Sequence, residues 1–191
     1  MRRVFSALLL TLLLGHAAAL ADVDVSLAHA GRVYDAATDR LFCLTGGSIT
    51  PVNPATGALE APIVVTTTSN LLPHLMTLSQ TGSQLYVGHD FGRRLAQVDL
   101  GTRLVVADWS AGTDSFGGKY FSSMAVLPGE PDKLLTWILP STGLGARSYA
   151  VFTHGVQTAS GSPTSFGTLF VPGNGPGEVL ALSNTSPSTM Q

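Results

Sequence analysis

Short apolar runs, each followed by a polar turn and a second apolar run, recur along the chain. Three segments share this pattern, at residues 33–43, 77–87 and 125–135. Their turns carry Asp39, Gly82 or Pro128–Gly129, residue types that suit tight reversals between strands. The leucines Leu41, Leu85 and Leu134 occupy the same place in each segment, at a spacing of roughly 40 to 50 residues. The pattern therefore predicts a repeated β-hairpin.

A further pair of strands is expected after each hairpin. Residues 49–57 and 95–102 read as a strand that ends at Asn or Asp and turns at a glycine, and residues 149–155 match them loosely. Apolar runs follow at 59–65 and 104–109. Four strands in roughly 40 to 50 residues is the length of one four-stranded propeller blade. The expected units are 31–68, 71–112, 120–160 and the start of a fourth at 165–182.

Helices are not expected after Ala21, because Gly and Pro interrupt the chain too often for a sustained helical period. A solenoid is the competing repeat architecture. The alternation in Leu85–Val87 and in 95–98 instead favours twisted antiparallel sheets.

Two of the turns resemble those of a known repeat family. Asn53-Pro54-Ala55-Thr56-Gly57 resembles the D/N-P-A-T-G turn of YVTN-type β-propeller repeats, and residues 78–88 look like their S-x-D-G-x-x-L-Y-V-G hairpin, with Thr81 where Asp is usual. The resemblance covers residues 31–182. It implies an all-β chain, a partial β-propeller of three to four four-stranded antiparallel blades after an N-terminal signal helix. Such repeats occur in surface-layer proteins, lactonases and quinoprotein-like subunits, so they imply a fold more than an activity.

The length of the chain differs from that of the family. The resemblance implies a closed ring of about seven blades, whereas this chain supplies three units and the start of a fourth. The outer faces of the first and last blades would then be exposed apolar surfaces. We therefore expect a fragment of a seven-bladed ring, either a truncated gene product or a half-ring that closes by homodimerisation.

The first 21 residues read as a secretory signal peptide. Arg2 and Arg3 precede an apolar run from Val4 to Leu14, and Ala19-Leu20-Ala21 supplies the small residues of a cleavage site. The run is short for a bilayer span, and the alternative is an uncleaved anchor. The mature chain is expected to begin at Asp22, to lie outside the cytoplasm without a membrane span, and to end in a disordered tail at 183–191.

Composition narrows the classes of partner. Charged residues make up 12% of the chain, about half of the ~25% typical of soluble domains, and the net charge is −2. No Lys/Arg cluster is present, so nucleic-acid binding is not expected. The only cysteine, Cys43, excludes an intrachain disulfide and a cysteine-based zinc site, and its apolar neighbours predict a buried strand thiol.

Catalytic, cofactor and metal motifs are not found in the sequence. The histidines lack the i, i+4 spacing of a helical metal site, no G-x-S-x-G turn occurs, and the glycines at 117–118 and 173–177 lack the context of a phosphate-binding loop. No catalytic residue, cofactor or metal is therefore assigned. His89-Asp90, at a predicted strand end, comes nearest to a binding pair, although a polar loop pair is the simpler interpretation.

Aromatic residues offer a second candidate surface. Trp109, Phe116, Tyr120, Phe121 and Trp137 could pack between blades or anchor a carbohydrate or peptide, and core packing is the commoner use. The segment 113–120 is the candidate binding loop, with Phe116, Lys119 and Tyr120 as its candidate contacts. The expected function is an exported propeller scaffold or binding protein with a protein or glycan partner. The alternative is a lactonase-like or quinoprotein-like enzyme fragment whose active site lies in missing blades.

Overall fold

The computed structural model describes residues 27–115, 117–142, 147–161, 167–172 and 179–183, with the last two segments described as backbone only. These residues form antiparallel strands, turns and one short 3-10 helix. The predicted signal peptide and its cleavage site, the candidate Phe116, the glycine turn at 173–177 and nearly all of the predicted tail lie outside the described residues.

The strands form three sheets and a final hairpin. Sheet 1 has the order β1 (Gly31–Asp35), β2 (Arg40–Thr45), β3 (Ser48–Val52) and β4 (Ile63–Val64). Sheet 2 has the order β5 (Leu72–Leu78), β6 (Gln84–His89), β7 (Arg94–Asp99) and β8 (Leu104–Ser110), with the 3-10 helix η1 (Asp90–Gly92) between β6 and β7. Sheet 3 contains β9 (Thr113–Asp114), β10 (Gly117–Leu127), β11 (Glu130–Pro140), β12 (Ser148–Thr153) and β13 (Val156–Gly161). The hairpin pairs β14 (Gly167–Pro172) with β15 (Val179–Ser183).

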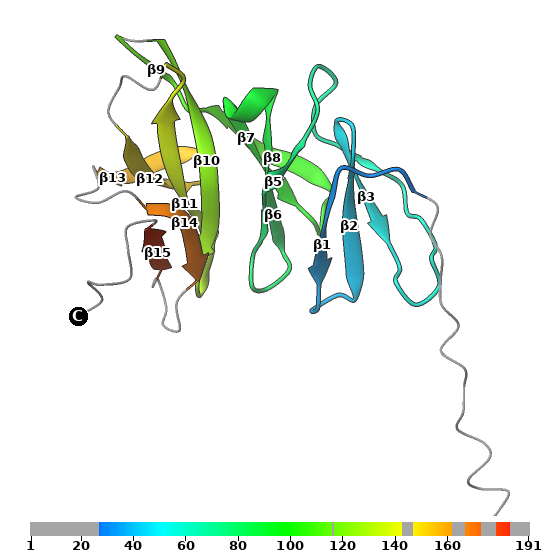
Figure 1. The fold of residues 1–191 in the computed structure, drawn as a ribbon. Coiled ribbons are helices and arrows are strands. Elements are labelled where there is room, and N and C mark those ends of the chain that lie inside the picture. The colour runs from blue at the N-terminus through cyan, green and yellow to red at the C-terminus, as the bar shows by residue number, and fades with distance from the viewer. Residues whose placement is uncertain (1–26, 116, 143–146, 162–166, 173–178, 184–191) are drawn as a thin grey trace, which may run out of the picture.

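The sheets follow one another in space in their order along the chain (Figure 1). Strand β1 contacts β5, β5 contacts β10, and β10 contacts β14. Strands β1, β5, β10 and β14 therefore lie in succession, and sheet 2 turns one face toward sheet 1 and the other toward sheet 3.

The predicted hairpins are confirmed. Strand β1 pairs with β2, β5 with β6, and β10 with β11. In the first turn the buried carboxylate of Asp35 accepts hydrogen bonds from the backbone N–H of Ala37 and the hydroxyl of Thr38. In the second, Gly82 has φ of +67°, which an L side chain rarely adopts. Local hydrogen bonds and a glycine thus fix two tight reversals.

The turn after β3 has the geometry that its sequence predicts. The side-chain oxygen of Asn53 accepts hydrogen bonds from the N–H groups of Ala55 and Thr56, at 2.9 and 3.2 Å, and Gly57 has φ of +70°. Such an Asx turn reverses the chain without help from the rest of the fold. The following apolar run is only partly a strand. Leu59 makes an isolated bridge with Val52, and β4 is confined to Ile63–Val64, because Pro62 has no N–H to donate to a ladder.

Alternation along sheet 2 divides its side chains between two cores. Leu85 and Val87 of β6 face sheet 1, whereas Tyr86 between them faces sheet 3. The first core fills the space between sheets 1 and 2 and contains Phe42, Leu44, Ile49, Ile63, Leu71, Leu85, Val87, Ala96 and Val98. Burial on both faces explains why β6 is buried along its whole length.

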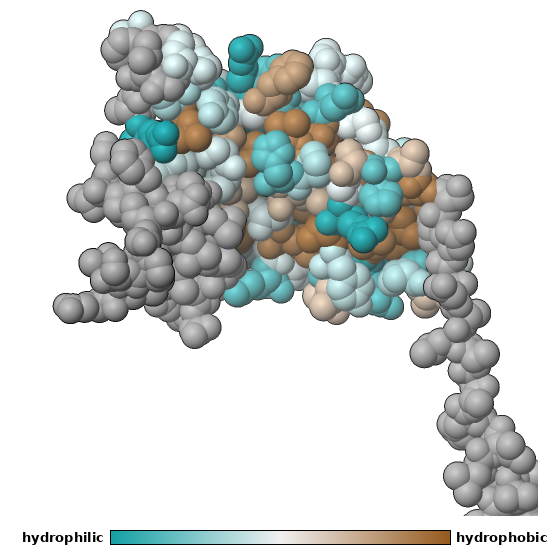
Figure 2. All heavy atoms as spheres, viewed as in Figure 1, coloured by the Kyte–Doolittle hydropathy of each residue, from teal (hydrophilic) through white to brown (hydrophobic). Residues whose placement is uncertain are grey.

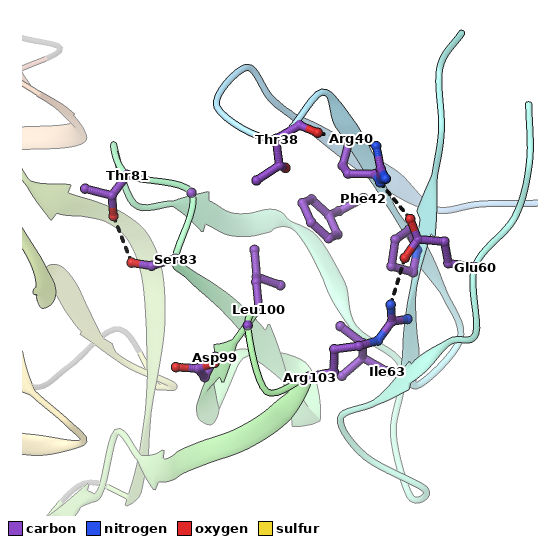
Figure 3. A pocket seen from close by; sticks show the side chains of 13 residues that line it. Thr38, Arg40, Phe42, Glu60, Ile63, Thr81, Ser83, Asp99, Leu100 and Arg103 are labelled. Carbon is purple, nitrogen blue, oxygen red and sulfur yellow. Dashed lines mark hydrogen bonds and ion pairs between the residues drawn. The ribbon is translucent and has the colours of Figure 1, made fainter. Parts of the chain in front are cut away.

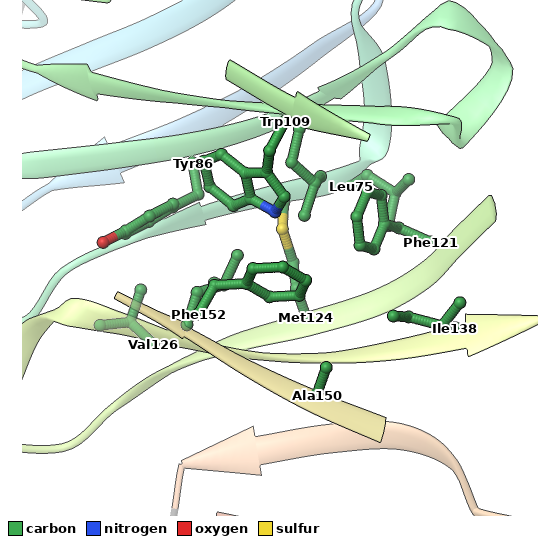
Figure 4. Close-up of a cluster of buried hydrophobic side chains, with 11 residues drawn as sticks. Leu75, Tyr86, Trp109, Phe121, Met124, Val126, Ile138, Ala150 and Phe152 are labelled. Atoms are coloured by element: carbon green, nitrogen blue, oxygen red, sulfur yellow. The ribbon is translucent and has the colours of Figure 1, made fainter. Parts of the chain in front are cut away.

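The second core lies between sheets 2 and 3 and is rich in aromatic rings (Figure 4). The centroid of the Trp109 ring lies 6.4 Å from that of Tyr86, in an edge-on arrangement, and 5.5 Å from that of Phe152. The Tyr86 hydroxyl donates to the Pro131 carbonyl at 3.0 Å, and burial raises the pKa of this phenol. Trp109 is 8% exposed and Phe121 is 1% exposed. These rings are therefore packing residues, as expected for most of the aromatic set, and Trp137 is likewise buried.

The segment 113–120 differs from the predicted loop. Strand β9 pairs with the start of β10, with Gly117 opposite Asp114 and Gly118 opposite Thr113, so the segment is a β-hairpin and sheet 3 gains a fifth strand. The backbone N–H of Lys119 also donates to the Gly112 carbonyl at 3.0 Å. Gly117 has φ of +124°, a conformation that an L side chain rarely adopts, so a glycine suits the start of β10.

The face of sheet 1 that points away from sheet 2 carries exposed apolar side chains. Cross-strand register places Tyr34, Leu59 and Val64 on that face, and each of them is more than half exposed. Cys43 also points to that side, but it is 3% exposed, and burial raises the pKa of its thiol. The prediction of a buried strand thiol is therefore confirmed. Figure 2 shows apolar surface between the polar side chains of the described sheets.

Candidate functional site

Pockets open at both ends of the boundary between sheets 1 and 2. The end that carries the β1–β2 and β5–β6 hairpins is called the lower end here, and the end that carries η1 is called the upper end (Figure 1). The lower pocket has a volume of about 430 Å³ and the upper pocket about 530 Å³. Their linings differ in chemistry.

An ion-pair clamp crosses the lower pocket (Figure 3). Glu60 accepts hydrogen bonds from Arg40 of sheet 1 at 2.6 Å and from Arg103 of sheet 2 at 2.8 Å. Arg103 also donates to the Ala61 carbonyl, and Arg40 donates to the carbonyls of Thr38 and Asp39. Because both guanidinium groups are already paired within the protein, the clamp joins the two sheets and leaves little capacity for an anionic ligand.

Glu60 makes the strength of this clamp depend on pH. A hydrogen bond from Arg103, which has the largest effect, and one from Arg40 hold the pKa of Glu60 below its ordinary 4.5. A carboxyl group whose pKa is lower in the folded state stabilises the fold at pH values above its unfolded-state pKa. That stabilisation is lost as the pH falls through the folded-state pKa. Each partner is about one-third exposed, so the contribution should not exceed about 1 kcal/mol per pair.

We expect Glu60→Gln to lower the melting temperature by about 2–4 °C at pH 7, and we expect this difference to shrink as the pH falls below 4.5 through the depressed pKa of Glu60. Calorimetric melts of both proteins across this range would measure it. Glu130→Gln, which removes the local Glu130–Lys133 pair, is the matched control and should change the melting temperature less. A Glu60 effect of equal size at pH 7 and pH 3 would contradict an ionic clamp.

The upper pocket is lined mainly by small polar side chains. A loop of five consecutive hydroxyl or amide residues, 66–70, forms much of its wall and is called the hydroxyl loop here. The rest of the lining consists of Gly47, Leu72, Asp90 and Phe91. Among the described residues of the lining, Asp90 alone is charged, so the pocket suits an uncharged polar ligand better than an anion.

A glycine turn of sheet 1 holds the hydroxyl loop in place. The Gly47 carbonyl accepts hydrogen bonds from the N–H groups of Val65 and Thr66, both at 3.0 Å, and the Gly46 carbonyl accepts one from Leu71 at 2.9 Å. A Cβ on Gly47 would lie 2.0 Å from the Thr66 carbonyl oxygen. Only a glycine permits this approach, so the β2–β3 turn sets the position of the loop.

The opposite wall is a turn in an unusual backbone conformation. Asp90, Phe91 and Gly92 have φ values of +49°, +56° and +82° in succession. A left-handed conformation costs an ordinary L residue about 1–2 kcal/mol. The Phe91 side chain is 84% exposed, so burial of the ring does not offset this cost. Strain of this kind is concentrated at sites where a side chain has to be presented in a fixed place.

Behind the pocket wall, four polar side chains form a chain of hydrogen bonds. His89 is 4% exposed, with its Nδ1 3.4 Å from the Ser69 hydroxyl and its Nε2 3.2 Å from Asp108 Oδ1. Arg94 also donates to Asp108 Oδ1, at 3.0 Å. Since a carboxylate only accepts hydrogen bonds, Nε2 carries the imidazole proton and Nδ1 is free to accept from Ser69. The set Ser69, His89, Asp108 and Arg94 is called the relay below.

The structure separates the residues that the sequence marked as binding candidates. His89 is buried in the relay, whereas Asp90 lines the upper pocket. Lys119 is on sheet 3, 3.8 Å from Asp114, and lines a smaller pocket of about 290 Å³ at the boundary between sheets 2 and 3. Tyr120 is a half-buried residue of β10 that lies against the Gly92 turn. The candidates therefore do not form one surface, and a role for each of them in binding stays a proposal.

Sequence reasoning missed Ser69, Phe91, Asp108 and the hydroxyl loop. The run Thr66-Thr67-Thr68-Ser69-Asn70 is visible in the sequence and could have marked a polar loop. Asp108 could not have been found, because only the pairing of β8 with β7 brings it opposite Ala96, near the end of β6. From its residue type Phe91 would be expected in the core, whereas in the structure its side chain is 84% exposed.

No family model and no curated protein sequence matches the chain. Solved structures do. The β-propeller domain of Cps50 (Swd1) from Myceliophteria thermophila matches with a TM-score of 0.61 and 12% identity, over 81% of this chain and 50% of that one. Kuenenia stuttgartiensis hydrazine synthase matches with a TM-score of 0.55 and 14% identity, over 78% of this chain and 40% of that one. The WD40 repeats of RRP9 match with a TM-score of 0.52 and 15% identity, over 73% of this chain and 40% of that one.

The chain is a partial β-propeller. The all-β fold class and the antiparallel, blade-like sheets expected from the sequence are confirmed, and each of sheets 1 to 3 is a blade. The chain spans half or less of the length of these solved structures. These matches include WD40 repeats, and none of the three identifies the YVTN class. At these identities they define the fold of the propeller and leave its activity to be argued from the site.

The described part of the propeller lacks two further features. No helix among these residues has the length and apolarity needed to cross a membrane. Within the same residues, no three His, Cys, Asp or Glu side chains are grouped closely enough to hold a metal ion.

Proposed function

We propose that this chain is an exported β-propeller binding protein that holds its partner, a neutral glycan, at the upper pocket. One observation carries the proposal. The Phe91 ring is 84% exposed on a backbone held in three successive left-handed conformations, beside a loop of hydroxyl and amide side chains. A propeller scaffold holds such loops rigidly at the ends of its blades.

The chemistry of the pocket favours a sugar over a charged ligand. Aromatic rings bind the apolar faces of sugar rings, and hydroxyl and amide groups exchange hydrogen bonds with sugar hydroxyls. Phe91 supplies the first kind of group, and Thr67 and Asn70 in the pocket lining supply the second. Asp90 supplies the charge in the described lining and would accept a hydrogen bond from a sugar hydroxyl.

Export is supported by the N-terminal sequence alone. The basic start, the apolar run and the small residues before Asp22 are the features of a secretory signal. An extracytoplasmic location would also bring the upper pocket into contact with extracellular or surface glycans.

We expect Phe91→Ala to weaken binding to a neutral oligosaccharide by at least about tenfold, a loss of ~1.4 kcal/mol, because the ring is the largest apolar group at the pocket. The measurement is an array of neutral oligosaccharides probed with the exported protein, followed by calorimetric titration of any hit. Tyr34→Ala removes an exposed aromatic from the free face of sheet 1 and should bind as the wild type does.

Two readouts of this experiment can contradict the proposal. An array without hits, or equal losses for Phe91→Ala and Tyr34→Ala, would reject a glycan site at the upper pocket and leave a protein partner as the alternative. N-terminal sequencing of the same sample should begin at Asp22. A chain that keeps Met1 would reject export by cleavage.

A further inference from the structure

Ser69 lies where the upper pocket meets the relay. It is one of the residues that line the pocket, and its hydroxyl is hydrogen-bonded to a buried imidazole whose far nitrogen is held by a carboxylate. We propose that Ser69 is an activated nucleophile and that the upper pocket catalyses acyl transfer from small neutral esters to water. This activity goes beyond glycan binding and does not require Phe91.

The hydrogen bonds of the relay have the direction that such chemistry needs. Asp108 accepts the Nε2 proton of His89 and so fixes the tautomer in which Nδ1 is a base. The Ser69 proton then points to Nδ1, and the serine oxygen keeps a lone pair for attack. A serine, a base and a group that orients the base are the parts of an activated nucleophile, and they are recognised by geometry rather than by a sequence motif.

A second contact prepares the serine oxygen for negative charge. The backbone N–H of Asp90 donates to Ser69 Oγ at 3.1 Å. This N–H belongs to the first residue of the left-handed turn, so the strained backbone holds it against the serine. A fixed N–H donor stabilises charge that develops on the oxygen as its proton leaves.

The reaction balances with the groups present. Ser69 Oγ forms a bond to the acyl carbon as its proton passes to His89 Nδ1, and the bond from that carbon to the alkoxy oxygen breaks as His89 returns the proton to the leaving alcohol. Water then attacks the acyl-serine, loses a proton to His89 and releases the carboxylic acid. The serine recovers its proton, and no oxidant, metal or cofactor is required.

The lining of the pocket restricts the substrate. Asp90 would repel an acyl group that carries a carboxylate, and the part of the lining that the structure describes has no Lys or Arg to receive one. The hydroxyl of Thr67 and the amide of Asn70 can donate to an ester carbonyl from the same lining. A volume of about 530 Å³ admits a small ester.

A biotin-linked fluorophosphonate tests the nucleophile directly. Attack by Ser69 forms an Oγ–P bond and expels fluoride, and peptide mass spectrometry identifies the modified serine. We expect labelling of Ser69 in the wild type and its loss in Ser69→Ala. Ser83→Ala is the matched control, because Ser83 is an exposed serine of the lower pocket hydrogen-bonded to Thr81, and labelling of Ser69 should persist in it.

Asp108 is a positioning residue, and its variant separates catalysis from folding. Asp108 is about one-third exposed, as Glu60 is, so Asp108→Asn should cost no more than the roughly 2–4 °C expected for Glu60→Gln and should leave the protein folded. Loss of the correct His89 tautomer should lower the maximal labelling rate at least about tenfold without weakening reversible binding of the probe. The hydrolysis rate of 4-nitrophenyl acetate should fall in parallel.

The proposal is overturned if Ser69 in the wild type is labelled no faster than Ser83, or if folded Asp108→Asn is labelled at the wild-type rate. Neither result bears on glycan binding, which is read from the array and from Phe91→Ala. Conversely, an oligosaccharide array without hits would not change what the labelling of Ser69 means for the proposed nucleophile.

Discussion

Trp109→Ala should lower the free energy of unfolding by about 3–5 kcal/mol. The indole lies in the core between sheets 2 and 3, against Tyr86 of its own sheet and Phe152 of the next one. Its Nε1 has no hydrogen-bond partner among the described residues, so the loss would be one of packing alone. Since domains are stable by only about 5–15 kcal/mol, a change of this size is a large part of the total. Urea denaturation of the two proteins measures it.

Phe91→Ala is the control for this prediction. It removes a large aromatic side chain that is 84% exposed, so its effect on unfolding should stay within about 0.5 kcal/mol. If Trp109→Ala cost as little as Phe91→Ala, Trp109 would not be packed between two sheets. The contrast also separates the aromatic that holds the fold together from the one proposed to bind a ligand.

Gly82→Ala should destabilise the protein by about 2–5 kcal/mol, through backbone strain and a steric clash at the lower end. The glycine has φ of +67°, and a Cβ there would lie 2.5 and 2.6 Å from the two carboxylate oxygens of Asp35 in the neighbouring sheet. Asp35 cannot yield easily, because it is 2% exposed and already bonded to Ala37 and Thr38. Thermal melts of the variant beside the wild type would give the difference.

Gly46→Ala isolates the strain from the clash. Gly46 has a similar φ of +62°, but a Cβ there meets no atom within 4 Å. This control should cost only the left-handed penalty of about 1–2 kcal/mol. Equal costs at the two glycines would mean that sheets 1 and 2 are not in contact at Asp35.

Much of the fold could be predicted because its signals are local. The four-residue turns between Asp35 and Arg40 and between Ser79 and Gln84 depend on nearby side chains and a glycine, and both hairpins were predicted at the right place. The hairpin at 113–118 was missed, since its strands pair over only two residues on each side and have no apolar alternation. The strand predicted at 59–65 is longer than the observed β4, because an apolar pattern does not reveal that Pro62 lacks a backbone N–H.

The candidate site could be predicted only in part, because its residues meet through tertiary structure. His89 and Asp90 were singled out from their place at a strand end, and the structure places both at or behind the upper pocket. Ser69 comes from the connection between two sheets and Asp108 from the fourth strand of sheet 2, so no spacing in the sequence joins them to His89. The exposure of Phe91 depends on three left-handed residues, two of which are not glycine.

The central claim is that successive sheets pack face to face as propeller blades, because the upper pocket opens at such a boundary. Proton NMR tests it most directly through nuclear Overhauser effects from the Trp109 indole to the ring of Phe152, whose centroid lies 5.5 Å away in the next sheet. The account predicts clear cross-peaks between these two rings. Cross-peaks from Trp109 to its own-sheet neighbour Leu95 without any to Phe152 would contradict it.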